Sequence, residues 1–279
     1  EPFLEHADIV KLDIQGVENL TEEVRALRRH KVRLLAEKVE TYEQYEQCKE
    51  LNFDLFQGNF FRRPDVVEGR KLPESKLAIL RALQQVLTAE ALDELHDVVK
   101  QDVGLSYRLL KYINSAAFGL RQEVASIEQA MSLLGLNKLR RWLSLLALTS
   151  LGDGKPTELV KTALYRAHFL ESLAGLLGER ETGDDFLLGM FSVLDALLDQ
   201  PMEQALEDLS LPGEVRQALL DDSAPMAHKL KLVLALDAGD WEAVNAWCLK
   251  HPRVKVTDLT RAQVEAMAWA DAQMSALSA

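Results

Sequence analysis

Three short apolar runs, separated by amphipathic segments, mark the first part of the chain. The runs lie at residues 7–14, 31–39 and 53–61, and their lengths are typical of strands. The intervening segments, 19–30 and 41–52, have apolar residues at helical spacing or a capping-box start. The order strand, helix, strand, helix, strand predicts parallel β-α units. Three such strands do not close a barrel.

From Leu77 onward, apolar residues follow the helical period almost without interruption. Glycines lie at several junctions between the periodic stretches, as is usual where helices end or turn. The predicted helices lie near 75–87, 89–101, 104–117, 126–135, 137–151, 157–178, 184–199, 202–209, 212–221, 226–238, 241–250 and 258–277. The fold class predicted is therefore mainly α, with a helical domain preceded by a partial α/β segment.

The stretch "VEGRKLPES" at 67–75 separates these two textures. It is charged and contains glycine and proline, which is typical of a linker. We therefore expect an N-terminal β-α domain over 1–66 and a helical domain over 76–279.

Composition limits the partners and the cellular location that we expect for the protein. The chain has 279 residues, of which 48% are hydrophobic and 27% charged, and it carries a formal charge of −12. The negative charge argues against a nucleic-acid partner. No apolar run approaches the roughly 20 residues that cross a bilayer, so no membrane partner is expected. Cys48 and Cys248 lack the spacing of a disulfide framework or metal site, which favours a reducing cytoplasmic location.

The N-terminal motifs resemble a known family. "DIVKLDI", "LLAEKVET" and "FDLFQGNFFRRP" resemble the last three β-α units of an EAL domain, a (β/α)-barrel family that hydrolyses cyclic di-GMP with metal ions. The resemblance implies that Lys11, Glu37, Glu40 and Gln57 occupy positions that surround the metals, the attacking water and the substrate.

Other carboxylates of that family's site would fall before Glu1. Because a two-metal site needs several converging carboxylates, Glu37 and Glu40 alone cannot form it. One interpretation is that Lys11, Glu37, Glu40 and Gln57 are remnants, with Glu37 paired to Lys11. The alternative is that they complete an active site whose N-terminal half lies outside this chain.

The helical part resembles a second family. "KQDVGLSYRLLKYINSAAFGL" and "SIEQAMSLLGLNKLRRWLSLLAL" resemble the HDOD domain, a helical signalling module related to the HD phosphohydrolases. Together the two resemblances indicate an EAL–HDOD tandem signalling protein. They imply a link to two-component or cyclic di-GMP signalling.

The resemblance to HD enzymes can be examined at their metal ligands. Their adjacent His-Asp pair would fall at Ser192 and Val193, and an earlier histidine near Thr162, with His168 the nearest candidate. Hydroxyl and isopropyl groups do not replace imidazole and carboxylate as ligands. We therefore expect no metal at this place and no other cofactor in the chain, and we expect His168 to be packed or on the surface.

Two aspartates lie near these positions. If residues 186–198 form one helix, Asp195 is turned ~200° away from Val193 and cannot substitute as a ligand. We expect Asp195 to be hydrogen-bonded or to face a solvated groove, and Asp199, before Pro201, to be exposed to solvent.

The expected function is a regulatory one. We expect that this chain is not an enzyme and acts in signal transduction by contact with a signalling protein partner. Asn114, Ser115 and Phe118 in "YINSAAFGL" are the candidate binding residues. The alternative for this motif is a structural turn with Phe118 in the core.

Two enzyme functions compete with this expectation. One is a cyclic di-GMP phosphodiesterase whose barrel is completed outside this chain, and the other is an HD-type phosphohydrolase, which would require bound metal. The open edges of a partial sheet also invite pairing with another chain, so a homodimer or a covering helix is expected.

Overall fold

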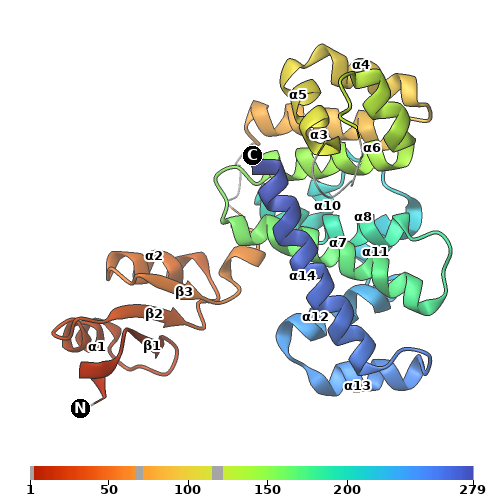
Figure 1. Ribbon diagram of the computed structural model, residues 1–279. Helices are drawn as coiled ribbons and strands as arrows, with labels where there is room; N and C mark the ends of the chain where they lie inside the picture. The colour runs from red at the N-terminus through yellow and green to blue at the C-terminus, as the bar shows by residue number, and fades with distance from the viewer. Residues whose placement is uncertain (1–2, 67–71, 115–121, 279) are drawn as a thin grey trace. The chain divides into compact units, whose positions relative to one another are not determined.

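The computed structural model describes residues 3–66, 72–114 and 122–278. It divides into two compact units, Glu1–Glu68 and Gly69–Ala279 (Figure 1). Each unit has its own set of buried apolar side chains.

The first unit is a small parallel sheet with helices between its strands. The strand order β1-β2-β3 follows the chain, and both strand pairs are parallel. The prediction of parallel β-α units is confirmed. Its elements are η1 (Leu4–His6), β1 (Ile9–Asp13), α1 (Leu20–Leu27), β2 (Arg33–Glu37), α2 (Tyr42–Glu50), β3 (Leu55–Gln57) and η2 (Phe60–Arg62).

Local sequence signals start the two helices of this unit. The side chain of Asn19 accepts a hydrogen bond from the Glu22 amide at the start of α1. Thr41 and Gln44 form a capping box at the start of α2, which satisfies amides that have no partner within the helix. Cys48 of α2 is fully buried among the apolar side chains of the central strand.

All the regular secondary structure in the described residues of the second unit is helical. No helix in the described segments is both long enough and apolar enough to cross a membrane. The helices are α3 (Glu74–Thr88), α4 (Leu92–Gln101), α5 (Val103–Ile113), α6 (Ile127–Leu151), α7 (Thr157–Leu177), α8 (Gly183–Phe191), α9 (Leu194–Leu198), α10 (Met202–Ala205), α11 (Gly213–Leu220), α12 (Ala227–Ala238), α13 (Trp241–Lys250) and α14 (Val256–Ser278).

A glycine bends α6. The sequence predicts separate helices over 126–135 and 137–151, whereas the structure joins them across a kink. Gly135 has φ of 70° and ψ of 172° at this point. Glycine adopts this conformation readily because it has no Cβ, so the two halves follow each other without an intervening loop.

The predicted single helix over 184–199 is wrong. α8 ends at Phe191, and Val193, with φ of −128° and ψ of 17°, separates it from α9. The hydroxyl of Ser192 donates a 2.7 Å hydrogen bond to the Gly189 carbonyl. Apolar periodicity does not reveal this interruption, because both short helices are buried over most of their length.

α8 packs closely against α7, and α14 runs along α7 as well (Figure 1). Gly189 makes the first contact possible. A Cβ built at Gly189 would lie 2.4 Å from the Ala167 nitrogen and 2.4 Å from the Arg166 carbonyl oxygen. Any side chain here would force the two helices apart. This close approach brings Ser192 next to the middle of α7.

Candidate functional site

The first candidate site lies at the carboxyl ends of the three parallel strands. Asp13, Glu37 and Gln57 are paired in register across β1, β2 and β3. The Lys11 ammonium on β1 lies 3.0 Å from a carboxylate oxygen of Glu37 on β2. The strand ends of parallel sheets commonly carry reactive side chains. The structure therefore joins two of the four residues selected from the EAL resemblance.

A second ion pair lies beside the first. Lys38 extends its ammonium to within 2.5 Å of Asp13. The Lys38 hydrogen bond lowers the pKa of Asp13, and the same contact raises the pKa of Lys38. Lys38 has φ of 62°, a conformation that favours glycine. This edge of the sheet thus holds two lysines and two carboxylates.

Glu40 and Gln57 lie nearby without joining these pairs. Both side chains are exposed. The Glu40 amide donates to the Gln44 side chain at 2.8 Å, and the Gln57 carbonyl accepts from the Val39 amide at 3.0 Å. Among the described residues, no hydrogen bond links either side chain to Lys11 or to Glu37. Carboxylates are suitable ligands for Mg²⁺ or Mn²⁺, but this edge alone supplies too few for a two-metal cage.

The second candidate site is the place in the helical unit where the resemblance to HD enzymes puts their metal ligands. Here the Ser192 hydroxyl accepts a 3.1 Å hydrogen bond from a guanidinium nitrogen of Arg166. Val193 is 1% exposed and packs in the core. Arg166 lies on the facing helix α7. A fixed positive charge therefore adjoins Ser192.

Arg166 is bound on its other side by Asp237 of α12. Its Nε and Nη2 atoms donate to one carboxylate oxygen of Asp237 at 3.1 and 2.9 Å. The two side chains are only 5% and 7% exposed. A buried charge is tolerated when it is paired and hydrogen-bonded in this way.

Asp195 and Asp199 differ from each other in their surroundings. Burial raises the pKa of Asp195, while the Ala196 amide and the Arg166 charge lower it by less. Asp199 was expected to be exposed, and that prediction is wrong. Its carboxylate lies 2.5 Å from the Lys155 ammonium, and the side chains are 12% and 9% exposed. The left-handed backbone of Asp199, with φ of 55°, ends α9 at this contact.

His168 packs against an aromatic ring. Its imidazole stacks on Trp269 with ring centroids 4.7 Å apart, and it lies 3.6 Å from a carboxylate oxygen of Glu171. Arg141 lies 2.6 Å from the same carboxylate group. Within the segments that the structure describes, no three His, Cys, Asp or Glu side chains gather closely enough to hold a metal ion.

Asn114 lies directly after α5 and binds Val124 through its side chain. Its side-chain amide donates to the Val124 carbonyl at 2.9 Å, and its side-chain oxygen accepts from the Val124 amide at 2.8 Å. The other two candidates in this motif, Ser115 and Phe118, lie outside the described residues. The binding role selected for all three stays a prediction.

Comparison with known proteins identifies one segment of the helical unit. Residues 71–207 match the HDOD domain. This segment is an HDOD domain. The chain is 34% identical, over 96% of its length, to a Vibrio cholerae protein named cyclic di-GMP phosphodiesterase CdgJ, of which it covers 63%. It is 32% identical, over 88% of its length, to the uncharacterized protein YuxH of Bacillus subtilis, of which it covers 61%. No solved structure matches the chain.

These comparisons confirm the HDOD resemblance and correct one expectation. The chain spans less than two thirds of the length of each of these relatives. The expectation that the chain is not an enzyme is contradicted, because a relative that aligns with 96% of it is named a phosphodiesterase. The expectation rested on the missing HD ligands of the helical unit and on the few EAL-type carboxylates of the first unit, and neither observation excludes an enzyme.

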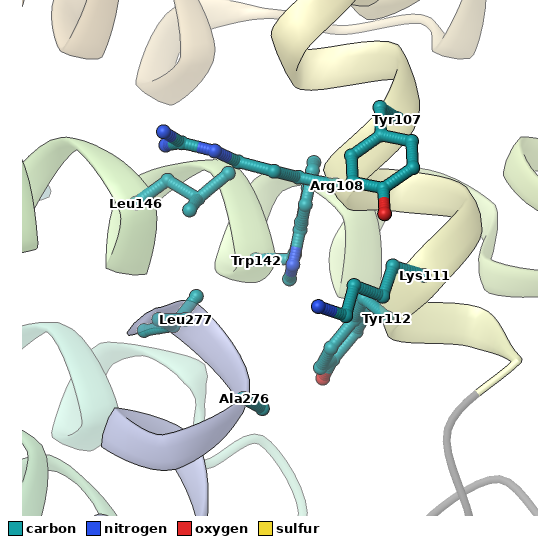
Figure 2. Close-up of a pocket in the computed structure, with 8 residues that line it drawn as sticks. All are labelled: Tyr107, Arg108, Lys111, Tyr112, Trp142, Leu146, Ala276 and Leu277. Atoms are coloured by element: carbon teal, nitrogen blue, oxygen red, sulfur yellow. The ribbon is translucent and has the colours of Figure 1, made fainter. Parts of the chain in front are cut away.

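A cavity in the helical unit was missed by the sequence analysis. It has a volume of about 170 Å³ and lies between α5, α6 and α14 (Figure 2). Its polar lining consists of Tyr107, Arg108, Lys111, Tyr112 and Trp142, and apolar side chains of α6 and α14 complete it. Basic residues on an exposed helix face are usually solvated, so spacing alone did not single them out.

Proposed function

We propose that the protein carrying this chain hydrolyses cyclic di-GMP. In this proposal the first unit is part of an EAL-type barrel, and the HDOD domain regulates it through contact with a signalling protein. The observation that carries the proposal is the 3.0 Å Lys11–Glu37 pair at the carboxyl ends of parallel strands. The 34% identical relative named as a cyclic di-GMP phosphodiesterase supports it.

The residues at the strand ends suit phosphodiester chemistry. Lys11 would stabilise negative charge that develops on a phosphate oxygen, and its pairing with Glu37 holds the ammonium at the strand ends. Glu37 and Glu40 would act as metal ligands or orient water, as the EAL resemblance implies. A divalent metal, when bound, would activate water and neutralise phosphate charge. Further carboxylates from other parts of the protein are required.

The HDOD domain is proposed as the regulatory part. α5 exposes large side chains on one side, with Val103 84% exposed and Tyr107 64% exposed. These two side chains are four residues apart and therefore lie on one helix face. We propose this face as a contact surface for the signalling partner.

The first unit also offers open sheet edges. In the described sheet, β1 and β3 each have one neighbour only. Unpaired edges of this kind are normally covered. We propose that further strands of the barrel cover them, with a homodimer as the alternative. Light scattering distinguishes the two, since only the second requires a dimer.

The experiment that tests the function is an assay of cyclic di-GMP hydrolysis by the whole protein that carries this chain, in the presence of Mg²⁺ or Mn²⁺. We expect the Lys11→Met and Glu37→Gln variants to lose about 100-fold or more in rate, as when a charge-stabilising group is removed. Glu46→Gln is the matched control, because Glu46 forms an exposed pair with Lys49 on α2. Hydrolysis that is absent from the wild-type protein, or equal in Glu37→Gln and Glu46→Gln, would refute the proposal.

A further inference from the structure

The backbone of Lys38, directly after β2, lies in the left-handed region. Its φ is 62°, a conformation that few residues other than glycine adopt, because Cβ comes too close to the following carbonyl oxygen. Strained backbone of this kind clusters at functional sites. The left-handed lysine therefore points to a role for its side chain beyond the fold of the sheet.

Hydrogen bonds on both sides hold Lys38 in this conformation. Its carbonyl accepts from the side-chain amide of Gln15 at 3.2 Å, in the loop after β1. The next amide, that of Val39, donates to the Gln57 carbonyl of β3 at 3.0 Å. A strained residue persists where its surroundings fix it in this way. The direction in which the Lys38 side chain leaves the sheet is therefore set by both neighbouring strands.

The Lys38 ammonium lies on the face of the sheet that carries Lys11. Side chains two residues apart on a strand share a face, so Lys11 and Asp13 of β1 lie together, and Glu37 of β2 is paired with Asp13. The helices α1 and α2 pack on the opposite face, around the fully buried Leu34. Since the Lys38 ammonium is 2.5 Å from Asp13, it reaches the face turned away from these helices.

Both ammonium groups on this face are accessible. The side chains of Lys38 and Lys11 are 57% and 49% exposed. Each contacts one carboxylate, and an ammonium has further N–H donors to offer. An exposed ion pair such as Lys38–Asp13 contributes little to stability, so an anion can share or replace it. The two carboxylates are on neighbouring strands, which lie about 4.8 Å apart. The two ammonium groups can therefore contact one ligand together.

The proposed substrate has two groups that suit this pair of lysines. Cyclic di-GMP contains two phosphodiesters, each negatively charged. In the proposed reaction Lys11 stabilises the phosphate that reacts. A second cation on the same face is then placed to hold the other phosphate, which lysine binds as a compact point charge.

We propose that Lys38 binds the second, unreacted phosphodiester of cyclic di-GMP and so determines substrate affinity. This inference rests on the proposed function, from which it takes the substrate. Asp13 holds the Lys38 ammonium in place before the substrate binds, and the phosphate then shares or replaces that contact. A ligand with a single phosphodiester lacks it.

The test is steady-state hydrolysis of cyclic di-GMP by the whole protein with the Lys38→Gly change. Glycine suits the left-handed backbone, so the variant loses the ammonium without added strain. We expect KM to rise about tenfold or more, as when a charge-assisted hydrogen bond is lost, with little change in kcat. Lys38→Arg, which keeps the charge, should restore most of the affinity. Lys49→Gln is the control, because Lys49 forms an exposed pair with Glu46 on α2.

Asp13→Asn separates phosphate binding from a structural role. If Lys38 served only to pair with Asp13, loss of either partner would have the same effect. We expect Asp13→Asn to have a KM no higher than that of the wild type, because it frees the ammonium and removes a negative charge. A KM unchanged in Lys38→Gly, or raised equally in Asp13→Asn, would overturn the proposal.

Binding measurements separate this proposal from the hydrolytic one. If the wild type does not hydrolyse cyclic di-GMP, the proposed function fails, and calorimetric titration with cyclic di-GMP then decides the role of Lys38. A Kd about tenfold or more higher in Lys38→Gly than in the wild type would support that role. Equal Kd values, or no binding by the wild type, would overturn it.

Discussion

Arg166 donates two hydrogen bonds to a single carboxylate oxygen of Asp237 inside the helical unit. The same guanidinium donates a third to the hydroxyl of Ser192. Ser192 is where the resemblance to HD enzymes places a metal ligand. At the position where the resemblance places that ligand, the Ser192 hydroxyl is thus hydrogen-bonded to a guanidinium that is itself paired with a carboxylate.

The Arg166–Asp237 pair should be important for stability. Arg166→Met leaves Asp237 buried without its main counter-charge, and we expect the free energy of unfolding to fall by about 3–5 kcal/mol. Urea denaturation followed by circular dichroism measures this loss. Lys161→Met is the control, because Lys161 and Asp271 form a largely exposed pair worth about 1 kcal/mol or less.

A double variant separates the charge effect from packing. Arg166→Met combined with Asp237→Leu removes both buried charges, so we expect it to recover much of the stability lost in Arg166→Met. An equal or larger loss in the double variant would contradict this interpretation. It would mean that side-chain volume, and not the unpaired carboxylate, determines the effect.

The contact between α7 and α8 should depend on Gly189. Gly189→Ala places a Cβ against the backbone of Arg166 and Ala167, so we expect a loss of about 1–3 kcal/mol or more. Gly175→Ala is the matched control on α7, since nothing lies within 4 Å of a Cβ there. It should gain up to about 1 kcal/mol from helix propensity. Thermal unfolding compares them, and similar shifts in Tm for both would be evidence against close packing at Gly189.

The pH dependence of stability should reflect Asp195. Burial raises the pKa of Asp195 in the folded state above its ordinary value of 3.8. Between those two pKa values the folded state binds more protons than the unfolded state, so stability falls as pH rises through this window. Asp195→Asn removes that loss.

We therefore expect Asp195→Asn to be more stable than the wild type at neutral pH. The difference should shrink as the pH falls through this window. Below the unfolded pKa, Asp195 of the wild type is protonated in both the folded and the unfolded state. Denaturation curves at a series of pH values check this. Stability profiles that run parallel across the acid range would show that Asp195 does not titrate abnormally.

Asn114 should be a structural residue whatever else it does. Asn114→Ala removes both hydrogen bonds to Val124, and we expect a loss of about 1–3 kcal/mol. Asn245→Ala, at an exposed position of α13, should change stability by only a few tenths of a kcal/mol, as helix propensity suggests. Hydrogen exchange of the Val124 amide gives a local measure. Unchanged protection of this amide in Asn114→Ala would contradict the assignment.

Regular patterns in the sequence were sufficient to predict most of the fold. The alternation of short apolar runs with capped helices at Asn19 and Thr41 is a local property, so the β-α order of the first unit could be predicted. The helical period of the second unit was equally clear. The break at Val193 was not, because buried residues surround it on both sides and periodicity does not change there.

Fewer features of the candidate sites could be predicted from the sequence. The contact of Lys11 with Glu37 could be expected from parallel strands and the motif. The partners of Arg166 and Asp199 come from distant segments, 71 and 44 residues away, and spacing says nothing about such pairs. The left-handed backbone of Lys38 is likewise visible only in the structure.

The rate of cyclic di-GMP hydrolysis in two variants tests the central claim most directly. If catalysis takes place at the strand ends of the first unit, Glu37→Gln should lose about 100-fold or more in rate. Ser192→Ala, in the helical unit, should keep the wild-type rate. Loss of hydrolysis in Ser192→Ala, with Glu37→Gln unaffected, would contradict the account.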